Sequence, residues 1–170
     1  HRTKKSLFKL SILLTGDQHG LVAVSWTNEV QPNILLVAND EAANDSMLQM
    51  TMKLGKPAGV TMAVKTIDDA LSILQNPKYA SRKIFVVTKN VKDAYKISQT
   101  INEVPGVNVG TAGIAYKGMN PVAVLPQVKM TNEEFDYAKK INEMGIPIFA
   151  QVSPTEEKVD FKGIETAFNK

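Results

Sequence analysis

The chain has 170 residues, of which 44% are hydrophobic and 22% are charged, and this size and balance are typical of one compact domain that buries a core. The absence of cysteine excludes disulfides, thiolate metal sites and cysteine nucleophiles, and it fits a reducing compartment. Apolar runs such as residues 34–38 and 84–87 are far shorter than the ~20 residues that a membrane-spanning helix needs, so no such helix is expected.

The net charge of +3 comes from a short basic arm over residues 1–10 that leads into the first strand. Four basic residues precede the first acidic one, Asp17, and from residue 10 onward 16 basic residues stand against 17 acidic ones. This distribution argues against a basic nucleic-acid-binding face. A segment added in cloning would explain His1, which therefore carries no functional weight. We expect residues 7–170 to form a single α/β domain.

In the first half of the chain, apolar segments rich in β-branched residues alternate with segments of helical spacing. Asp40 is expected to cap a helix in which Met47, Met50 and Leu54 recur three and four residues apart, and the cluster of Met47, Met50 and Met52 is interpreted as helix packing. The predicted elements are a strand over residues 7–14, a turn over 15–20, a helix over 21–29, a strand over 33–38, the helix after Asp40 and a strand over 60–64.

The second half continues this alternation. Thr66 is expected to cap a helix, and Thr131 with Glu134 predicts a capping box. The predicted elements are a helix over residues 66–74, a strand over 84–88, a helix over 91–101, a strand over 107–109, an edge strand or irregular ribbon over 121–130, a helix over 131–144, a strand over 146–152 and a helix over 161–168. Because parallel strands need crossovers, the pattern predicts a Rossmann-like α/β domain, with a mostly parallel central sheet and helices on both faces.

His19 is the strongest candidate for chemistry. Ligands of such sheets bind beyond the carboxyl ends of the strands, and His19 lies in the turn after the first strand. A neutral imidazole is nucleophilic, and the backbone N–H groups of Gly20 and Leu21, at the start of the next helix, could hold a phosphoryl group on it. From position alone, a loop histidine that only hydrogen-bonds the neighbouring backbone is an equal alternative.

Other chemistries have weaker support. Histidine phosphatases and mutases need a second active-site histidine and an arginine beside the first, whereas Gln18 precedes His19 here. A metal site built on His19 and Asp17 would need distant carboxylates such as Asp40, at no recognisable spacing. The chain has no G-x-G-x-x-G, G-x-x-x-x-G-K-[ST] or G-x-S-x-G motif, so nucleotide and hydrolase functions have no motif behind them.

The sequence from His19 onward resembles a known family. His19-Gly20, then Val22, Ser25-Trp26 and residues 34–45, are similar to the H-G-Q-V…W…I-I-V-V-N-D-E-V-A-x-D pattern of the IIB phosphocarriers in the mannose/fructose/sorbose class of the bacterial phosphoenolpyruvate-dependent sugar phosphotransferase system. Three later segments also match: residues 57–60 resemble P-P-G-V, residues 88–93 resemble F-K-N-P-x-D, and residues 108–117 resemble N-V-G-G-M-A-Y-K with a small insertion. The resemblance covers essentially the whole chain.

The resemblance implies a protein-Npi-phosphohistidine-sugar phosphotransferase. In it, His19 accepts a phosphoryl group from a phosphohistidine of a IIA protein and passes it to a sugar that moves through the membrane components IIC and IID. It implies a cytoplasmic protein, associated peripherally with the inner face of the membrane through the transporter, and it implies no metal, no organic cofactor and no nucleic acid. The sequence leaves open the sugar, the oligomeric state, including a homo-oligomer, and the imidazole nitrogen that is phosphorylated.

The segment before His19 departs from the family pattern R-x-D-D-R-L-I-H-G. Ile12 and Gly16 stand in place of the two arginines, and Leu14 and Thr15 in place of the acidic pair. Arginine binds phosphate through paired donors, so its loss should weaken transfer. The alternatives are that Thr15, Asp17 and Lys89 take over these tasks, or that the chain is a divergent IIB-like regulatory or binding module. A small-molecule enzyme on the same sheet is a third, less supported alternative.

Three candidate site residues lie in the loops after later strands. Asp40 is interpreted as a helix cap or an active-site group, and Lys89 as a phosphate contact or a solvated loop charge. Gly110 is expected to serve the backbone geometry around the site. The predicted phosphate- or partner-binding residues, which surround the catalytic His19, are Thr15, Asp17, Gly20, Leu21, Asp40, Lys89 and Gly110.

Overall fold

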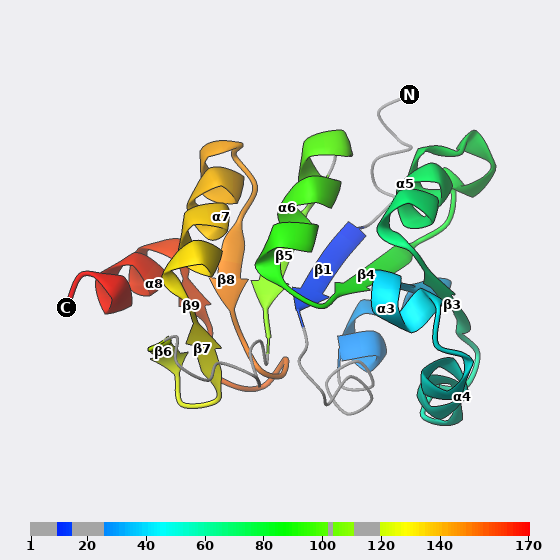
Figure 1. Ribbon diagram of the computed structural model, residues 1–170, viewed down its shortest axis with the longest axis horizontal. Coiled ribbons are helices and arrows are strands. Elements are labelled where there is room, and N and C mark those ends of the chain that lie inside the picture. Colours follow the sequence, from blue (N-terminus) through cyan, green and yellow to red (C-terminus); the bar gives the residue numbers. More distant parts are fainter. Residues whose placement is uncertain (1–9, 15–25, 102–103, 111–119) are drawn as a thin grey trace.

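A central sheet of seven strands organises the computed structural model, which describes residues 10–14, 26–101, 104–110 and 120–170 (Figure 1). Its strands are, in chain order, β1 (Leu10–Leu14), β2 (Ile34–Ala38), β3 (Thr61–Lys65), β4 (Ile84–Thr88), β5 (Gly106–Val109), β8 (Ile148–Ala150) and β9 (Val159–Asp160). Across the sheet they lie in the order β3-β2-β4-β1-β5-β8-β9, and every neighbouring pair is parallel except β8 with β9. The predicted mostly parallel α/β sheet is confirmed, with β1 at its centre.

Helices connect the strands on both faces. They are α3 (Asp40–Ala43), α4 (Ser46–Leu54), α5 (Ile67–Gln75), the 3-10 turn η1 (Pro77–Tyr79), α6 (Val91–Thr100), α7 (Asn132–Glu143) and α8 (Phe161–Phe168). Residues 26–30, which precede β2, are also helical. A separate two-stranded antiparallel ribbon of β6 (Val122–Leu125) and β7 (Val128–Met130) accounts for the predicted irregular ribbon.

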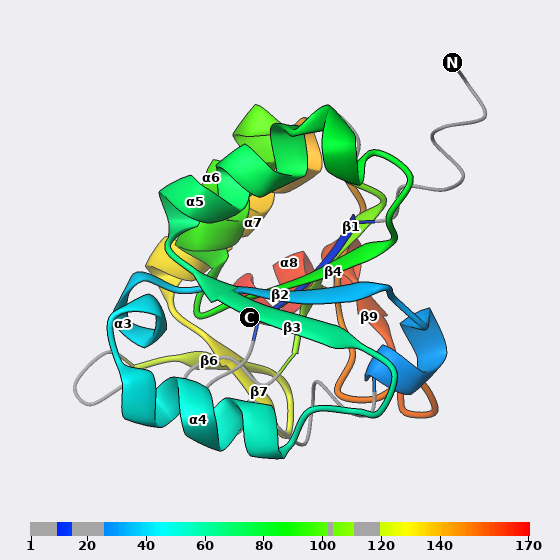
Figure 2. The ribbon, with the colours of Figure 1, turned by 90° about the vertical axis from the view of Figure 1, so that its right-hand side faces the viewer.

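Alternating side chains of the inner strands serve the two faces, as the period of a strand requires. Leu36 and Val86 belong to the large core cluster formed with α5, α6 and α7. Leu35 and Phe85, one residue earlier, pack on the opposite face with Trp26 of the helix over residues 26–30. Figure 2 shows this layering, with α5, α6 and α7 on one side of the sheet and α4 on the other. Strands covered on both faces explain the nearly continuous apolar runs in the sequence.

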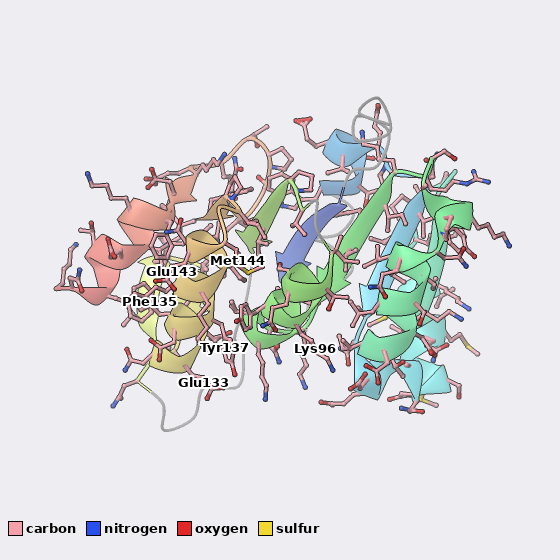
Figure 3. All side chains as sticks on the ribbon, turned by 90° about the horizontal axis from the view of Figure 1, so that it is seen from above. Lys96, Glu133, Phe135, Tyr137, Glu143 and Met144 are labelled. Atoms are coloured by element: carbon pink, nitrogen blue, oxygen red, sulfur yellow. The ribbon has the colours of Figure 1, made fainter. Side chains whose placement is uncertain are left out.

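An aromatic cluster attaches the C-terminal helix to the domain. Phe135 of α7 stacks on Phe161 and Phe168 of α8, with ring centroids 6.0 and 4.4 Å apart. Tyr137, also on α7, instead meets Tyr95 of α6 at 5.6 Å. Figure 3 shows Phe135 and Tyr137 on opposite sides of α7, toward α8 and α6 respectively. The helix α7 therefore contacts both α6 and the C-terminal helix α8. The predicted helix over residues 161–168 is confirmed.

Local hydrogen bonds set most helix starts. Thr66 accepts a hydrogen bond from Asp69 N at 3.1 Å, as predicted. Thr131 accepts from Glu134 N at 3.1 Å while Glu134 Oε1 accepts from Thr131 N at 3.1 Å, which confirms the capping box. Asp40 does not cap the helix that follows it in the sequence, as had been predicted, because Asn39 caps the short α3 and Asp45 caps α4.

The apolar face predicted for α4 was also wrong. Met47, Met50 and Leu54 are 78%, 66% and 85% exposed, whereas Met52 is buried and packs in a cluster with Val37. The helix carries apolar residues on two sides, and the contacts with β2 select one of them. Only the Met52 part of the methionine cluster therefore serves helix packing.

The last predicted strand is shorter than expected. β8 covers Ile148–Ala150 within the predicted span of residues 146–152. The backbone of Gln151 does not continue the sheet ladder, because it bonds to the side chain of Asn108 on β5 instead. The chain then turns back and pairs Val159–Asp160 antiparallel to β8 as β9.

Candidate functional site

The carboxyl ends of the five inner parallel strands lie level with one another. Leu14 of β1 is in register with Thr88 of β4 and with Val109 of β5, while Thr88 is also in register with Ala38 of β2. Val109 continues the row to Ala150 of β8. We call this row and the residues that directly follow it the carboxyl edge. Because ligands of open α/β sheets bind beyond such an edge, the structure assigns the candidate site to it.

Five predicted site residues lie outside the residues that the structure describes. They are Thr15, Asp17, His19, Gly20 and Leu21, all within the stretch of residues 15–25. The described backbone ends at Leu14 on the carboxyl edge and resumes at Trp26. The other three predicted residues, Asp40, Lys89 and Gly110, follow β2, β4 and β5 at this same edge.

Lys89 and Glu41 form an ion pair across the ends of β4 and β2. The ammonium group of Lys89 donates a hydrogen bond to Oε1 of Glu41, and the two side chains are 49% and 76% exposed. A pair this exposed contributes only about 0–1 kcal/mol to stability. The ammonium group can therefore exchange the carboxylate for another anion at little cost.

Asp40 has a structural partner at the same edge. Its Oδ1 accepts a hydrogen bond from Ile67 N, the first residue of α5, at 2.8 Å. Asn39 beside it caps α3 through a 3.1 Å bond from Ala42 N. Asp40 thus acts as a cap, as one of the two interpretations had it, but the helix that it caps is α5, which lies 27 residues further on.

Asp93 adds a half-buried carboxyl group that sequence reasoning missed. It lies in the first turn of α6, where Asn90 accepts a hydrogen bond from its backbone N at 2.8 Å. Burial raises the pKa of Asp93, the carboxylate of Asp40 raises it further, and the lysines at positions 92, 96 and 89 oppose the shift. Asp40 and Lys89 are therefore close enough to Asp93 for their charges to affect its pKa.

Asn108 is a second residue that the sequence did not reveal. It lies in β5, is 6% exposed, and bonds in both directions to the backbone of Gln151: its Nδ2 donates to Gln151 O and its Oδ1 accepts from Gln151 N, both at 3.0 Å. Gly110, two residues later, is buried at the carboxyl edge. Asn108 thus holds the loop after β8 in place. Its signal in the sequence was a polar residue inside an otherwise apolar strand.

Two features of the carboxyl edge can attract an anion, although the carboxyl groups of Asp40, Glu41 and Asp93 also lie there. The helix α6 begins at this edge with Asn90 as its cap, so the partial positive charge of its N-terminus faces the edge. The exposed Lys89 adds a full positive charge. Among the described residues, no three His, Cys, Asp or Glu side chains are placed to hold a metal ion. Within those residues, moreover, every helix is too short or too polar to cross a membrane.

Residues 17–170 match the family model described as the PTS system sorbose subfamily IIB component. The chain is 35% identical over 144 residues to a probable phosphotransferase enzyme IIB component of Streptococcus pyogenes, an alignment that covers 83% of this chain and 88% of the relative. It is 26% identical over 152 residues to the mannose-specific EIIAB component of Escherichia coli, covering 89% of this chain but only 46% of that longer relative.

Solved structures share the fold. The IIB domain of the sorbose permease from Klebsiella pneumoniae superposes with a TM-score of 0.82 at 16% identity and covers 93% of this chain and 97% of that one. A protein named manxB from Thermoanaerobacter tengcongensis gives a TM-score of 0.81 at 19% identity, covering 94% and 96% of the two chains. At these identities the likeness establishes the arrangement of strands and helices.

Proposed function

Because this chain belongs to the sorbose-subfamily IIB components of the sugar phosphotransferase system, we propose that His19 is the residue that carries its phosphoryl group. IIB components take phosphate from a IIA protein and pass it to a sugar during transport, so the chain is a phosphotransferase. The identity of the phosphorylated residue goes beyond family membership.

The observation that carries the assignment is the position of β1. Its last residue, Leu14, lies between Thr88 and Val109 at the carboxyl edge. His19 follows five residues later, and five residues of extended chain reach at most about 18 Å. The other histidine, His1, precedes β1 and falls outside the family match, which begins at residue 17.

Groups at the carboxyl edge support a phosphoryl group on His19. Lys89 follows β4, the strand beside β1, and the carboxylate of Glu41 to which it binds is exposed. A phosphoryl group carries more negative charge than the Glu41 carboxylate, so it would compete well for the ammonium group. The start of α6 would add backbone N–H donors at the same edge.

The reaction has two displacements at phosphorus. In the first, a neutral imidazole nitrogen of His19 attacks the phosphorus of the donor phosphohistidine, and the N–P bond of the donor breaks as the new one forms. In the second, a sugar hydroxyl attacks the same phosphorus, the P–N bond to His19 breaks, and the hydroxyl proton ends on the imidazole ring, so that His19 leaves as neutral imidazole. Both steps depend chiefly on alignment and on charge stabilisation by groups such as Lys89.

The partners follow from this reaction. We propose that a IIA protein donates the phosphoryl group, that a sugar accepts it while bound to membrane components IIC and IID, and that the chain works at the cytoplasmic face of the membrane. The Escherichia coli relative is named an EIIAB component, in which the part similar to this chain is about half of the protein. That arrangement supports a IIA protein as the immediate donor.

A second candidate function rests on the residues before His19. Position 12 lies inside β1, in register with Val86 and Val107, and position 14 ends the strand. Isoleucine and leucine stand there in place of charged family residues. A module that docks on the same partners but transfers phosphate poorly would fit these substitutions.

Intact-mass analysis distinguishes the two functions. The chain is incubated with phosphoenolpyruvate, the general phosphotransferase proteins and a mannose-class IIA protein, as wild type, His19→Ala and His1→Ala. We expect one acid-labile phosphoryl group on the wild type and on His1→Ala, and none on His19→Ala. A wild type that stays unmodified beside a competent IIB control would favour the docking module.

A further inference from the structure

One long-range hydrogen bond anchors the chain where it leaves the stretch of residues 15–25. The indole Nε1 of Trp26 donates to the carbonyl oxygen of Val152 at 3.0 Å, although 126 residues separate the two. Val152 lies two residues past the end of β8. Figure 2 shows the loop that follows β8 running beside the helix of residues 26–30. Trp26 packs against β2 and β4, whereas β8 lies on the other side of β1 in the sheet. The hydrogen bond therefore links the helix of residues 26–30 to the loop after β8.

The acceptor is itself held in place. The two 3.0 Å bonds between the buried Asn108 amide and the backbone of Gln151 fix the residue next to Val152. The side chain of Gln151 donates to Glu156 O at 3.0 Å and so closes the loop on itself. Asn108 is in register with Leu13 of β1. The residues that hold Val152 are therefore connected to the central strand through β5.

The two residues that flank positions 15–25 are thus fixed to one frame. Leu14, before them, belongs to β1, and Trp26, after them, is connected through the loop after β8 and Asn108 to β5 beside β1. Trp26 is half-buried against Leu35 and Phe85, which leaves its N–H as the group that needs a partner. The bond to Val152 O supplies that partner and fixes Trp26, the first described residue after the stretch that contains His19.

We propose that Trp26 and Asn108 are positioning residues for phosphoryl transfer, because they fix the point at which the described chain resumes after the segment that contains His19. The inference rests on the proposed role of His19. Transfer between two histidines needs the attacking nitrogen, the phosphorus and the leaving nitrogen in line, and a displacement of about 1 Å can lower a rate by roughly a hundredfold. Loss of the Trp26 bond should therefore slow transfer more than it weakens binding of the donor.

Trp26→Phe tests this directly, because it keeps an aromatic ring and removes the N–H donor. Initial rates are measured over a range of phosphorylated IIA concentrations. We expect kcat to fall by roughly tenfold or more while KM for the phosphorylated IIA protein stays within about twofold. Chemical phosphorylation by phosphoramidate, a small donor that needs no docking, should keep its wild-type rate, which would show that the imidazole itself is as reactive as in the wild type.

Two further variants complete the test. Val30→Ala, on the same helix and in the same cluster, removes packing but no hydrogen bond, and it should leave kcat near the wild-type value. Asn108→Asp keeps the size of the side chain but cannot donate to Gln151 O, and it should lower kcat as Trp26→Phe does. A normal kcat for Trp26→Phe, or an equal loss in Val30→Ala, would overturn the inference while leaving His19 as acceptor. Failure of the wild type to accept phosphate would overturn both.

Discussion

Replacing Lys89 with methionine removes the cation at the end of β4 and keeps most of the side-chain length. A hydrogen bond to a charged group contributes about 1.5–3 kcal/mol, which corresponds to about a 10- to 150-fold change in rate if the contact is made to the phosphoryl group in transit. The ion pair with Glu41 is exposed, so its loss should lower the free energy of unfolding by no more than about 1 kcal/mol. Lys89→Met should therefore slow transfer strongly and destabilise the fold little.

The assay is the single-turnover rate of phosphoryl acceptance from phosphorylated IIA, with urea unfolding as the stability measurement. Lys83→Met is the matched control, because Lys83 directly precedes the same strand at its opposite end and the charge change is equal. Glu41→Gln, which frees Lys89, should retain or raise the rate. A Lys89→Met rate within about twofold of Lys83→Met would refute the assignment of Lys89 to the phosphoryl group.

Three stability predictions follow from burial, titration and capping. Met52→Ala should lower the free energy of unfolding by about 2–5 kcal/mol, whereas Met50→Ala on the exposed side of α4 should stay within about 0.5 kcal/mol of wild type in the same urea titration. Because the pKa of Asp93 is raised in the fold, the folded state binds protons more tightly there, so stability falls as pH rises from the unfolded toward the folded pKa. Asp93→Asn should stabilise the protein at neutral pH, with a gain that shrinks as the pH approaches 3.8, and a gain constant with pH would contradict this. Thr131→Ala removes half of the capping box and should cost about 0.5–2 kcal/mol in thermal unfolding, whereas an unchanged midpoint would show that the cap is dispensable.

Much of the fold was predictable because local sequence and burial agree. The strands β2 and β4 are covered on both faces, so they appear in the sequence as apolar runs, and their observed bounds differ from prediction by at most one residue. The Thr131 and Glu134 spacing marks its own helix start, since both hydrogen bonds of the capping box are made within four residues. Such features need no knowledge of the rest of the chain.

The division between α3 and α4 was missed for a physical reason. Asn39 and Asp45 are both good caps six residues apart, and the apolar residues after them fit a helix packed on either of two sides. Leu48 and Met52 face the core only because Val37 and Ala42 lie beneath them. Tertiary contacts of this kind decide between patterns that the spacing alone leaves equal.

The positions of Asp40 and Lys89 at the carboxyl edge were predictable, but their hydrogen-bond partners were not. Lys89 and Asp40 could be placed at the carboxyl edge because each follows a recognisable strand. The partner of Lys89 is 48 residues away, and Asn108 bonds to a residue 43 positions further on. Pairings over such distances depend on which strands become neighbours, and the order of β1 between β4 and β5 is set by the whole sheet.

The most direct test of the central claim is to locate the phosphoryl group on the chain. The wild-type protein is phosphorylated through the IIA protein, digested at alkaline pH where phosphohistidine survives, and its peptides are fragmented to assign the modified residue. We expect a phosphoryl group on His19 that disappears when unphosphorylated IIA protein is added, since the transfer is reversible. A phosphoryl group on any other residue, or one on His19 that cannot be returned to the IIA protein, would contradict the central claim.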